Sequence, residues 1–202
     1  MSTIQIKVPN WLDYIFTFPL LTYRLLRFGY SFRRIYLGEG EWTILDAADY
    51  YRLNNFKWFL TGRFHKFYAA RAIKIDGRTK ITRMHRDIMN PPDNLVVDHI
   101  NSDGLDNRRQ NLRLATKSQN GCNSRKRKNT SSIYIGVHLR KKQGRWEAEI
   151  THNRKKIWLG SFDNEITAAR AHDRAAIKYH GEFARLNFPR EDYNVEIQNT
   201  ND

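Results

Sequence analysis

The chain contains the stretch Val97-Asp98-His99-Ile100, followed by Asn111-Leu112-Arg113 and then by Asn120. A short apolar run leads into an acid and a histidine, and a second alternating run follows a segment rich in turn residues. This pattern predicts two short strands joined by a loop. Thr116 then stands where a helix N-cap is expected, with the helix running through Asn120. Packing of strand, loop, strand and helix would bring their polar side chains to one place.

Four polar residues of this stretch are candidates for a common site: Asp98, His99, Asn111 and Asn120. A carboxylate, an imidazole and amide oxygens are the groups needed to hold one hard divalent cation and to activate one water molecule. Taken singly, each has an ordinary explanation, because an Asp-His pair is usually a surface pair and an asparagine is usually a turn or cap residue. Their joint order and spacing favour a site.

Composition restricts the partners of the chain. Its 202 residues, 40% of them hydrophobic, are enough for one large or two small cores. With 35 Lys and Arg against 21 Asp and Glu, the net charge is +14. Such a field attracts nucleic acid or an anionic membrane.

Most of this charge lies between Lys117 and Lys156, where twelve Lys and Arg residues face only Glu147 and Glu149. The run Arg125–Lys128 can be a solvated loop or an import signal. Its place directly after the candidate site favours a linker that contacts phosphates.

Membrane and secretory functions are disfavoured. The apolar run from Trp11 to Phe28 contains Asp13 and Pro19 as well as arginines, whereas a spanning helix needs about 20 mostly apolar residues. Cys122 is the only cysteine, which excludes disulfide frameworks and multi-cysteine zinc sites. We expect a cytoplasmic protein with no membrane partner.

The residues before the candidate site predict short strands. A run ending in Ile73-Lys74-Ile75 alternates and stops at Asp76-Gly77, which is typical of a hairpin turn, and Lys80–Met84 would be the returning strand. Residues 46–59 predict a short helix or a pair of turns. The first 35 residues have no assigned role beyond an amphipathic aromatic segment.

The residues after the linker predict three antiparallel strands and a helix. Ile135, Val137 and Leu139 alternate with polar neighbours, and the same alternation continues from Trp146 and again from Lys156. A helix is expected from an Asn164 cap to His180. Its predicted apolar stripe is Ala168, Ala171, His172, Ala175 and Tyr179.

The expected fold class is therefore α+β: a β-rich N-terminal region leading into a strand-strand-helix core, then a three-stranded antiparallel sheet packed on one C-terminal helix. The predicted regions are residues 1–35, a region 36–123 with its core at 85–123, a basic linker 124–131, a region 132–189 and a tail 190–202.

Residues 44–123 resemble the HNH family of homing endonucleases, whose core is a ββα-metal motif. The motifs that carry the resemblance are Met84-His85-Arg86, Val97–Asn101, Leu105–Arg109, Asn111–Arg113 and Asn120. Asn120 stands where the family name implies a final histidine, so the likeness is to members with an H-N-N triad. An amide oxygen in that place suits Mg²⁺, with Mn²⁺ as an alternative.

The resemblance implies roles for these residues. His99 would be the general base that takes a proton from water, and Asn111 would fix the loop and orient the imidazole. Asp98 and Asn120 would hold one Mg²⁺ against the scissile phosphate. Arg109 and Arg113 would clamp phosphates, and the products would be a 5′-phosphate and a 3′-hydroxyl. His85 is expected to be structural or to contact phosphate.

Residues 134–189 resemble the Apetala and ethylene-response-factor type of DNA-binding domain. The resemblance rests on Tyr134–Val137, Gly144–Ile150, Trp158–Phe162, Ala168–Ala171 and Phe183–Pro189. It implies that the sheet lies in the major groove of double-stranded DNA. His138 and Thr151 occupy positions where plant members use arginine, so the plant target sequence is not carried over.

The predicted DNA contacts differ in kind. Arg140 would read guanine, Lys142 and Lys156 would touch phosphate, and Trp158 would either contact the groove or pack in the core. The full set of predicted contacts is Arg109, Arg113, Arg125, Lys126, Arg127, Lys128, His138, Arg140, Lys142, Thr151, Lys156 and Trp158.

These observations favour a metal-dependent DNA endonuclease of the homing type, phage- or intron-encoded, acting as a monomer or homodimer. Two alternatives remain open. One is a sequence-specific DNA-binding regulator with a vestigial nuclease site, and the other is a restriction or anti-phage nuclease with the same chemistry.

Overall fold

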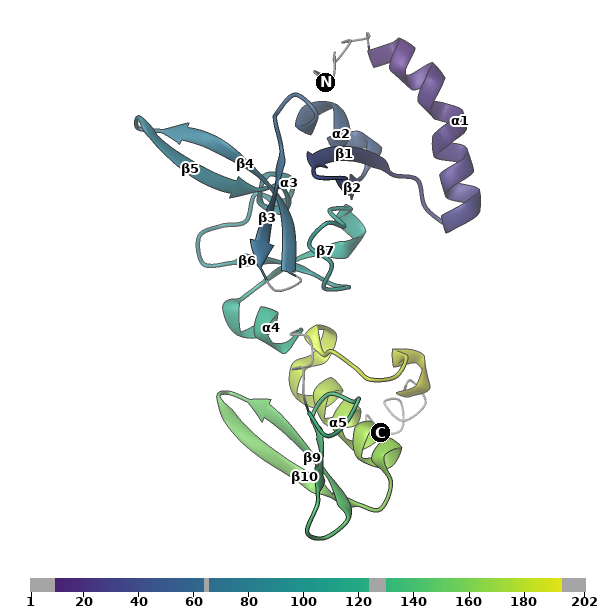
Figure 1. Ribbon diagram of the computed structural model, residues 1–202, viewed down its shortest axis with the longest axis vertical. Helices are drawn as coiled ribbons and strands as arrows, with labels where there is room; N and C mark the ends of the chain where they lie inside the picture. Colours follow the sequence, from purple (N-terminus) through teal and green to yellow (C-terminus); the bar gives the residue numbers. More distant parts are fainter. Residues whose placement is uncertain (1–9, 64–65, 124–129, 194–202) are drawn as a thin grey trace, which may run out of the picture. The chain divides into compact units, whose positions relative to one another are not determined.

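The computed structural model describes residues 10–63, 66–123 and 130–193, and it divides the chain into two compact units (Figure 1). The first unit is Met1–Leu114 and the second is Ala115–Asp202. Both combine helices with antiparallel strands, which confirms the α+β class. Among the described residues, no helix is long and apolar enough to cross a bilayer.

The first unit opens with a helix and continues with short strands and helices. In chain order its elements are α1 (Asn10–Phe28), β1 (Arg33–Gly38), β2 (Glu41–Leu45), α2 (Ala47–Leu53), β3 (Phe59–Arg63), β4 (Lys66–Ile75), β5 (Arg78–Arg83), α3 (Met84–Met89), β6 (Val96–His99), the 3-10 turn η1 (Arg109–Asn111) and β7 (Leu112–Ala115).

The predicted hairpins are present. β4 pairs with β5 across Asp76 and Gly77, whose φ angles of 50° and 73° are those of a turn that matches the strand twist. β3 lies on the other side of β4, β1 pairs with β2, and β6 pairs with β7. The helix or turns expected at residues 46–59 are the single short helix α2. The strand-loop-strand arrangement around Asp98 is thus confirmed.

The N-terminal aromatic segment forms α1, which the sequence left unplaced. Asp13 on this helix pairs with Arg33 of β1 at 3.0 Å, so the helix is tied to the first hairpin. Many of its large apolar side chains are nevertheless exposed: Ile15, Phe16, Phe18, Leu20, Tyr23, Leu25, Leu26 and Phe28.

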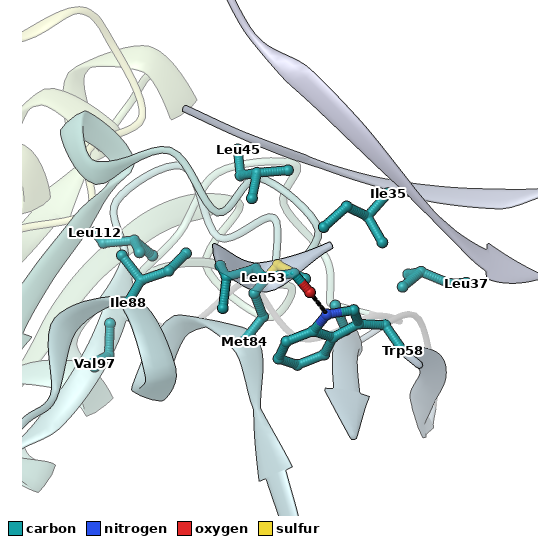
Figure 2. Packing of buried hydrophobic residues seen from close by; sticks show 10 residues of the cluster. Ile35, Leu37, Leu45, Leu53, Trp58, Met84, Ile88, Val97 and Leu112 are labelled. Atoms are coloured by element: carbon teal, nitrogen blue, oxygen red, sulfur yellow. Dashed lines mark hydrogen bonds between the residues drawn. The ribbon is translucent and has the colours of Figure 1, made fainter. Parts of the chain in front are cut away.

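The core of the first unit joins both hairpins to the helices between them. Figure 2 shows Leu53 of α2 and Trp58 at its centre, with the indole Nε1 of Trp58 donating to the carbonyl of Leu53 at 2.8 Å. Met84 of α3, Val97 of β6 and Leu112 of β7 belong to the same cluster. β6 and β7, which carry the candidate site, therefore rest on a core built by residues from the whole unit.

The second unit contains the predicted three-stranded sheet in the order β10-β9-β8, with α5 packed against it. Its elements are α4 (Lys117–Cys122), β8 (Val137–Arg140), β9 (Arg145–His152), β10 (Lys155–Phe162), α5 (Glu165–His180), η2 (Gly181–Phe183) and η3 (Arg190–Tyr193). Thr116 caps α4 in a capping box with Gln119, as predicted. The Asn164 side chain accepts from Ile166 and Thr167 at the start of α5.

The stripe by which α5 packs differs in part from the predicted one. Ala168 and His172 are buried as expected, but Ala169, Asp173 and Ala176 are buried as well. Asp173 was not predicted to be inside, because an acid is rarely buried without partners. Its carboxylate accepts from the backbone N–H of Asn187 at 2.8 Å and of Phe188 at 3.0 Å, and from the Tyr193 hydroxyl at 3.0 Å.

The first strand of this sheet is shorter than predicted. The alternation suggested a strand from Tyr134, whereas β8 begins at Val137. The reason is that Ile135 bonds elsewhere: its N–H donates to Asn187 Oδ1 at 2.6 Å, and its carbonyl accepts from Asn187 Nδ2 at 3.1 Å. The alternation of apolar and polar residues therefore begins at Tyr134, before the backbone enters the sheet at Val137.

Candidate functional site

The loop between β6 and β7 is held closed by Asn111. Its amide nitrogen donates to Asn101 Oδ1 at 2.9 Å and to the Asp106 carbonyl at 2.8 Å, while its Oδ1 accepts from the Asn101 N–H at 3.0 Å. The backbone carbonyl of Asn111 accepts from Ile100 at 2.9 Å. A single buried asparagine thus fixes both ends of the loop that follows His99.

The N-terminal hairpin fixes the other side of this loop. The N–H of Ile44 donates to the Leu105 carbonyl at 2.9 Å, and the N–H of Asn107 donates to the Ile44 carbonyl at 2.8 Å. The Thr43 hydroxyl donates to the same Leu105 carbonyl at 2.7 Å. β2, more than fifty residues earlier in the sequence, is therefore part of the frame of the candidate site.

His99 is the last residue of β6, and its side chain is enclosed, with only 6% of the residue exposed. Its ring lies edge-on to that of His85, with centroids 4.9 Å apart, and Tyr68 lies within 6 Å of both rings. Burial lowers the pKa of His99, although the contact with Asn107 opposes this. The imidazole is therefore neutral at neutral pH, as a general base requires.

Asn107 determines how the His99 ring is oriented. The amide nitrogen of Asn107 donates to the Thr43 hydroxyl at 2.8 Å, which turns its Oδ1 toward His99 Nε2 at 3.4 Å. A hydrogen bond accepted by this Oδ1 requires the proton on Nε2, and a neutral ring with that proton carries its lone pair on Nδ1. The sequence assigned orientation of the imidazole to Asn111, whereas this bond comes from Asn107.

Asp98, the predicted metal ligand, is 4% exposed and forms an ion pair with Arg113. Arg113 Nε and Nη2 donate to the same carboxylate oxygen, Oδ2, at 2.9 and 2.8 Å. The guanidinium that was predicted to clamp phosphate is thus engaged with the carboxylate that was predicted to hold the metal.

The neighbouring arginines also pair with acids. Arg109 donates through Nε and Nη2 to the two oxygens of Asp49, at 2.7 and 2.9 Å, although its own side chain is half exposed. Arg108 makes the same two-point contact with Asp106, at 2.7 and 2.6 Å, and lies 3.5 Å from the centroid of the Tyr30 ring. These guanidinium groups brace the loop from α2 and from the segment after α1.

Gly104 lies in a turn of the loop between β6 and β7, where it is buried against β4. A Cβ at this position would lie 2.2 Å from the Phe67 carbonyl oxygen and 2.5 Å from the Tyr68 ring. The residue allows the loop to approach the strand that carries Tyr68.

The donor set of the first unit is limited. Among the described residues there is no group of three or more His, Cys, Asp or Glu that could hold a metal ion. Mg²⁺, however, is usually held by one or two carboxylates together with substrate phosphates and water. Asp98 fits that chemistry. Asn120, the second predicted ligand, lies on α4 of the second unit.

In the second unit, the strand register brings the predicted DNA contacts onto one face of the sheet. His138 pairs with Glu147, Glu149 with Trp158, and Thr151 with Lys156. Because paired residues share a face and alternate residues repeat it, Arg140 lies there as well. Trp158 is 64% exposed, which decides against core packing for this side chain.

The cations of this face are matched with carboxylates from β9. Arg140 Nε and Nη2 donate to Glu147 Oε1 and Oε2 at 2.8 and 3.0 Å, and His138 Nε2 lies 3.2 Å from Oε2. The ion pair with Arg140 lowers the pKa of Glu147. Lys156 Nζ donates to Glu149 Oε1 at 2.6 Å.

Other predicted contacts are only partly located. Lys142 lies in the exposed turn between β8 and β9. Arg125, Lys126, Arg127 and Lys128 lie outside the described residues.

Sequence reasoning missed three residues that shape these two surfaces. Asn107 and Thr43 order the candidate nuclease site, and Glu147 anchors two of the predicted DNA contacts. Asn107 was visible only as part of a motif, and Thr43 gave no signal because its partner is distant in sequence. Glu147 was assigned to the polar face, but not as a buried residue.

Comparison with protein families finds two matches, which do not overlap. Residues 90–122 match the HNH endonuclease family, and residues 132–182 match the AP2 domain. The first match contains Asp98, His99, Asn111 and Asn120, and the second contains the three-stranded sheet and all of α5. Together they cover the two regions for which the sequence suggested a chemical role.

Individual relatives match less than half of the chain. APETALA2-like protein 2 of rice is 42% identical over 85 residues, which is 42% of this chain and 18% of the rice protein. The AP2-like ethylene-responsive transcription factor TOE2 of Arabidopsis thaliana is 42% identical over 82 residues, covering 41% of this chain and 16% of that protein. A rice AP2/ERF and B3 domain-containing protein is 48% identical over 59 residues, 29% of this chain and 16% of its own length. The chain thus spans less than a fifth of these relatives.

Proposed function

We propose that this protein binds double-stranded DNA through the exposed sheet face of its second unit and hydrolyses a phosphodiester bond at the β6–β7 site of its first unit. The single observation that carries the proposal is that one chain contains both an AP2-type sheet and an enclosed, neutral imidazole. That imidazole, in His99, follows a carboxylate directly within a segment that matches HNH endonucleases.

DNA binding by the second unit is supported by charge and by shape. Arg140, Lys156 and Trp158 are exposed on one face of the sheet, while α5 covers the other. A face that presents an arginine, a lysine and an aromatic side chain to solvent suits the edges of base pairs and the adjacent phosphates. The relatives of this chain include a protein named as a transcription factor.

Hydrolysis would depend on His99 as the general base. Its pKa is lowered by burial, so the neutral form is present at neutral pH, and Asn107 keeps the lone pair on Nδ1. Asn111 keeps the loop after His99 closed. Arg113 forms an ion pair with Asp98. When a cation binds Asp98, the guanidinium of Arg113 would pair with a phosphate instead.

The cation that fits this arrangement is Mg²⁺, held by Asp98 together with phosphate oxygens and water. When bound, it would stabilise charge on the transition state and on the departing 3′ oxygen. Asn120 as a further ligand stays a prediction of the family resemblance. The expected products are a 5′-phosphate and a 3′-hydroxyl.

Supercoiled plasmid provides the test. The purified chain should convert it to nicked or linear forms with Mg²⁺ and leave it intact with EDTA. The His99→Ala variant should lose about 10²- to 10⁴-fold in rate, the contribution typical of a general base, while its affinity for DNA stays unchanged. His152→Ala, which removes a histidine of the second unit, is the matched control and should keep the rate.

Cleavage that persists at the full rate in His99→Ala would refute the catalytic assignment. Loss of DNA binding together with cleavage would instead show that the substitution damages the fold. The ends of the product, tested by ligation, should carry the 5′-phosphate.

A DNA-binding regulator with an inactive nuclease site is the second candidate, and two observations favour it. The matched relatives include proteins named as transcription factors, and the Asp98 carboxylate is engaged with Arg113. This candidate predicts tight, selective binding of duplex DNA with no Mg²⁺-dependent nicking at any enzyme concentration. Binding and cleavage assays on the same preparation separate the two.

If cleavage is found, a homing endonuclease of phage or intron origin is the role that we propose. A restriction or anti-phage nuclease would have the same chemistry. The two differ in target: a homing enzyme should cut a long site at a defined position, whereas a defence nuclease should cut many sites in foreign DNA.

A further inference from the structure

Glu147 stands out on the sheet face proposed to bind DNA, because a carboxylate there opposes a polyanion. It is 6% exposed, whereas its neighbours on this face, Arg140 and Lys156, have side chains that are 55% and 71% exposed. The acid therefore lies beneath the cations that surround it, at the level of the sheet. It contacts Arg140 and His138, both on the adjacent strand β8.

The contact with Arg140 fixes the plane of the guanidinium. Two N–H groups, on Nε and Nη2, point to the two oxygens of Glu147 at 2.8 and 3.0 Å. A guanidinium has five N–H donors in a rigid fork, so this pairing leaves the edge between Nη1 and Nη2 facing away from the carboxylate. That edge can donate two parallel hydrogen bonds, the number needed to read the O6 and N7 atoms of guanine.

Such an arrangement makes little sense for an arginine that only binds phosphate. The carboxylate cancels much of the positive charge of Arg140, which weakens a purely electrostatic contact. The ion pair is useful when the arginine side chain must adopt one orientation. A guanidinium that is already held in place loses less rotamer freedom when it binds DNA. The burial of Glu147 and its second contact with His138 keep the carboxylate itself in place.

We propose, on the basis of the DNA-binding function proposed above, that Glu147 is a positioning residue that sets the base specificity of Arg140. It does not touch the DNA. It holds the guanidinium so that the outer edge meets one guanine, and it gives the protein selectivity at the cost of general affinity.

Glu149 offers a matched comparison on the same strand. It pairs with Lys156 through one hydrogen bond of 2.6 Å, and both groups are more exposed than the Glu147 carboxylate. A lysine ammonium is a point charge without a fork, so orienting it cannot specify a base. Glu149 should therefore modulate affinity without changing selectivity.

The experiment uses the full chain in EDTA and a pool of random-sequence DNA duplexes as the probe. Selection with the wild-type protein defines a preferred duplex, in which each G·C pair is then replaced in turn by A·T. Fluorescence anisotropy gives the affinity of the wild type, Glu147→Gln, Glu149→Gln and Arg140→Ala for each duplex and for an unselected duplex of equal length.

Glu147→Gln should lose at least about fivefold in discrimination at one G·C pair, the lower end of what one two-point contact contributes. Its affinity for the unselected duplex should rise or stay equal, because a negative charge has been removed. Arg140→Ala should lose discrimination at the same pair, and adding Glu147→Gln to Arg140→Ala should change it no further. Glu149→Gln should shift the affinities for all duplexes alike.

Three results would overturn the inference while leaving DNA binding in place. One is full discrimination in Glu147→Gln, another is an equal loss of affinity for every duplex, and the third is a wild-type protein that selects no sequence. If Glu147→Gln does not fold, Glu147→Asp replaces it. Aspartate keeps the charge but is one methylene shorter, so it should lower discrimination at the same pair, and unchanged discrimination would again overturn the inference. A wild-type chain that binds no duplex would refute the proposed function itself.

Discussion

The candidate sites of the two units differ in how their arginine–carboxylate pairs are buried. In the first unit, Arg108 with Asp106 and Arg113 with Asp98 have both partners largely buried, although the Arg109 side chain is half exposed in its pair with Asp49. On the sheet of the second unit, the Glu147 carboxylate is buried and the Arg140 side chain is exposed. The enclosed pairs hold the loop between β6 and β7 in one conformation, whereas the pair with Glu147 leaves the Arg140 guanidinium at the surface, where we propose that it contacts DNA. Burial of both partners therefore suits a structural pair, and an exposed cation suits a pair that contacts a partner.

The sharpest test of this contrast is Asp106→Asn. The substitution leaves the buried guanidinium of Arg108 without its counter-charge, and breaking a buried pair in this way costs about 3–5 kcal/mol. The first unit should lose that much free energy of unfolding, measured by amide hydrogen exchange resolved by segment.

The matched variant for that test is Glu149→Gln in the surface pair of the second unit, which should cost less than about 1 kcal/mol. Equal losses in the two variants would show that burial does not separate the pairs.

A smaller effect is expected from Gly104→Ala. The added methyl group would meet the Phe67 carbonyl and the Tyr68 ring, so the loop must move away from β4, at a cost of about 1–3 kcal/mol by overpacking. Nicking of plasmid should fall with it, because the same loop follows His99.

Gly121→Ala is the control for Gly104→Ala. Among the described residues, no atom other than its chain neighbours and the backbone of its own helix lies within 4 Å of the added Cβ, so alanine inside α4 should be neutral or stabilise by up to about 1 kcal/mol. A stability loss in Gly121→Ala as large as that in Gly104→Ala would contradict the packing explanation.

The enclosed histidines predict a pH dependence for the first unit. Burial lowers the pKa of His85 from 6.5 to about 3, and its Nδ1 has no hydrogen-bond partner among the described residues. As the pH falls, His85 therefore binds a proton near pH 6.5 in the unfolded state, but only near pH 3 in the folded state. Stability from this group is present above pH 6.5 and is lost as the pH falls below it, at up to about 1.4 kcal/mol per pH unit.

His85→Phe should reduce the dependence of the unfolding free energy on pH between pH 6 and pH 4 by the contribution of one proton, which is about 1.4 kcal/mol per pH unit. Urea denaturation at several pH values measures it. An unchanged slope in His85→Phe would mean that the imidazole is not kept neutral by burial.

The smallest effect on stability is expected from Lys156→Ala. Its pair with Glu149 is exposed, so the free energy of unfolding should change by less than about 1 kcal/mol. DNA binding should nevertheless weaken uniformly across sequences, and the slope of log K against log salt should become shallower by about 0.9 for one lost phosphate contact. A sequence-dependent loss would move Lys156 from phosphate contact to base reading.

Local pattern was enough to predict the second unit almost completely. Alternating residues define its strands, and Asn164 marks the start of α5. The errors there came from long-range polar contacts, such as the bond between Ile135 and Asn187, which makes β8 begin later than predicted. The burial of Asp173 has the same origin, because its partners come from the segment after α5.

The first unit was predictable at the level of motifs, but not of contacts. Asp98 and His99 were identified because they are adjacent and follow an apolar run. The hydrogen bond between His99 and Asn107 was not predicted, because Asn107 is held by Thr43. Thr43 belongs to a hairpin that lies more than fifty residues earlier in the sequence. The pairing of Arg113 with Asp98 also went unpredicted, since either residue alone fits a role at a phosphate.

The sequence by itself determined which residue types stand at which spacing, and so the strand periodicity, the helix caps, the basic character and the family-like motifs. Only the tertiary structure decided which charged groups form ion pairs with each other and which face solvent. The physical reason is that a charge acquires its role from its desolvation and its nearest partner, and both are set by elements that the fold brings together from distant parts of the chain.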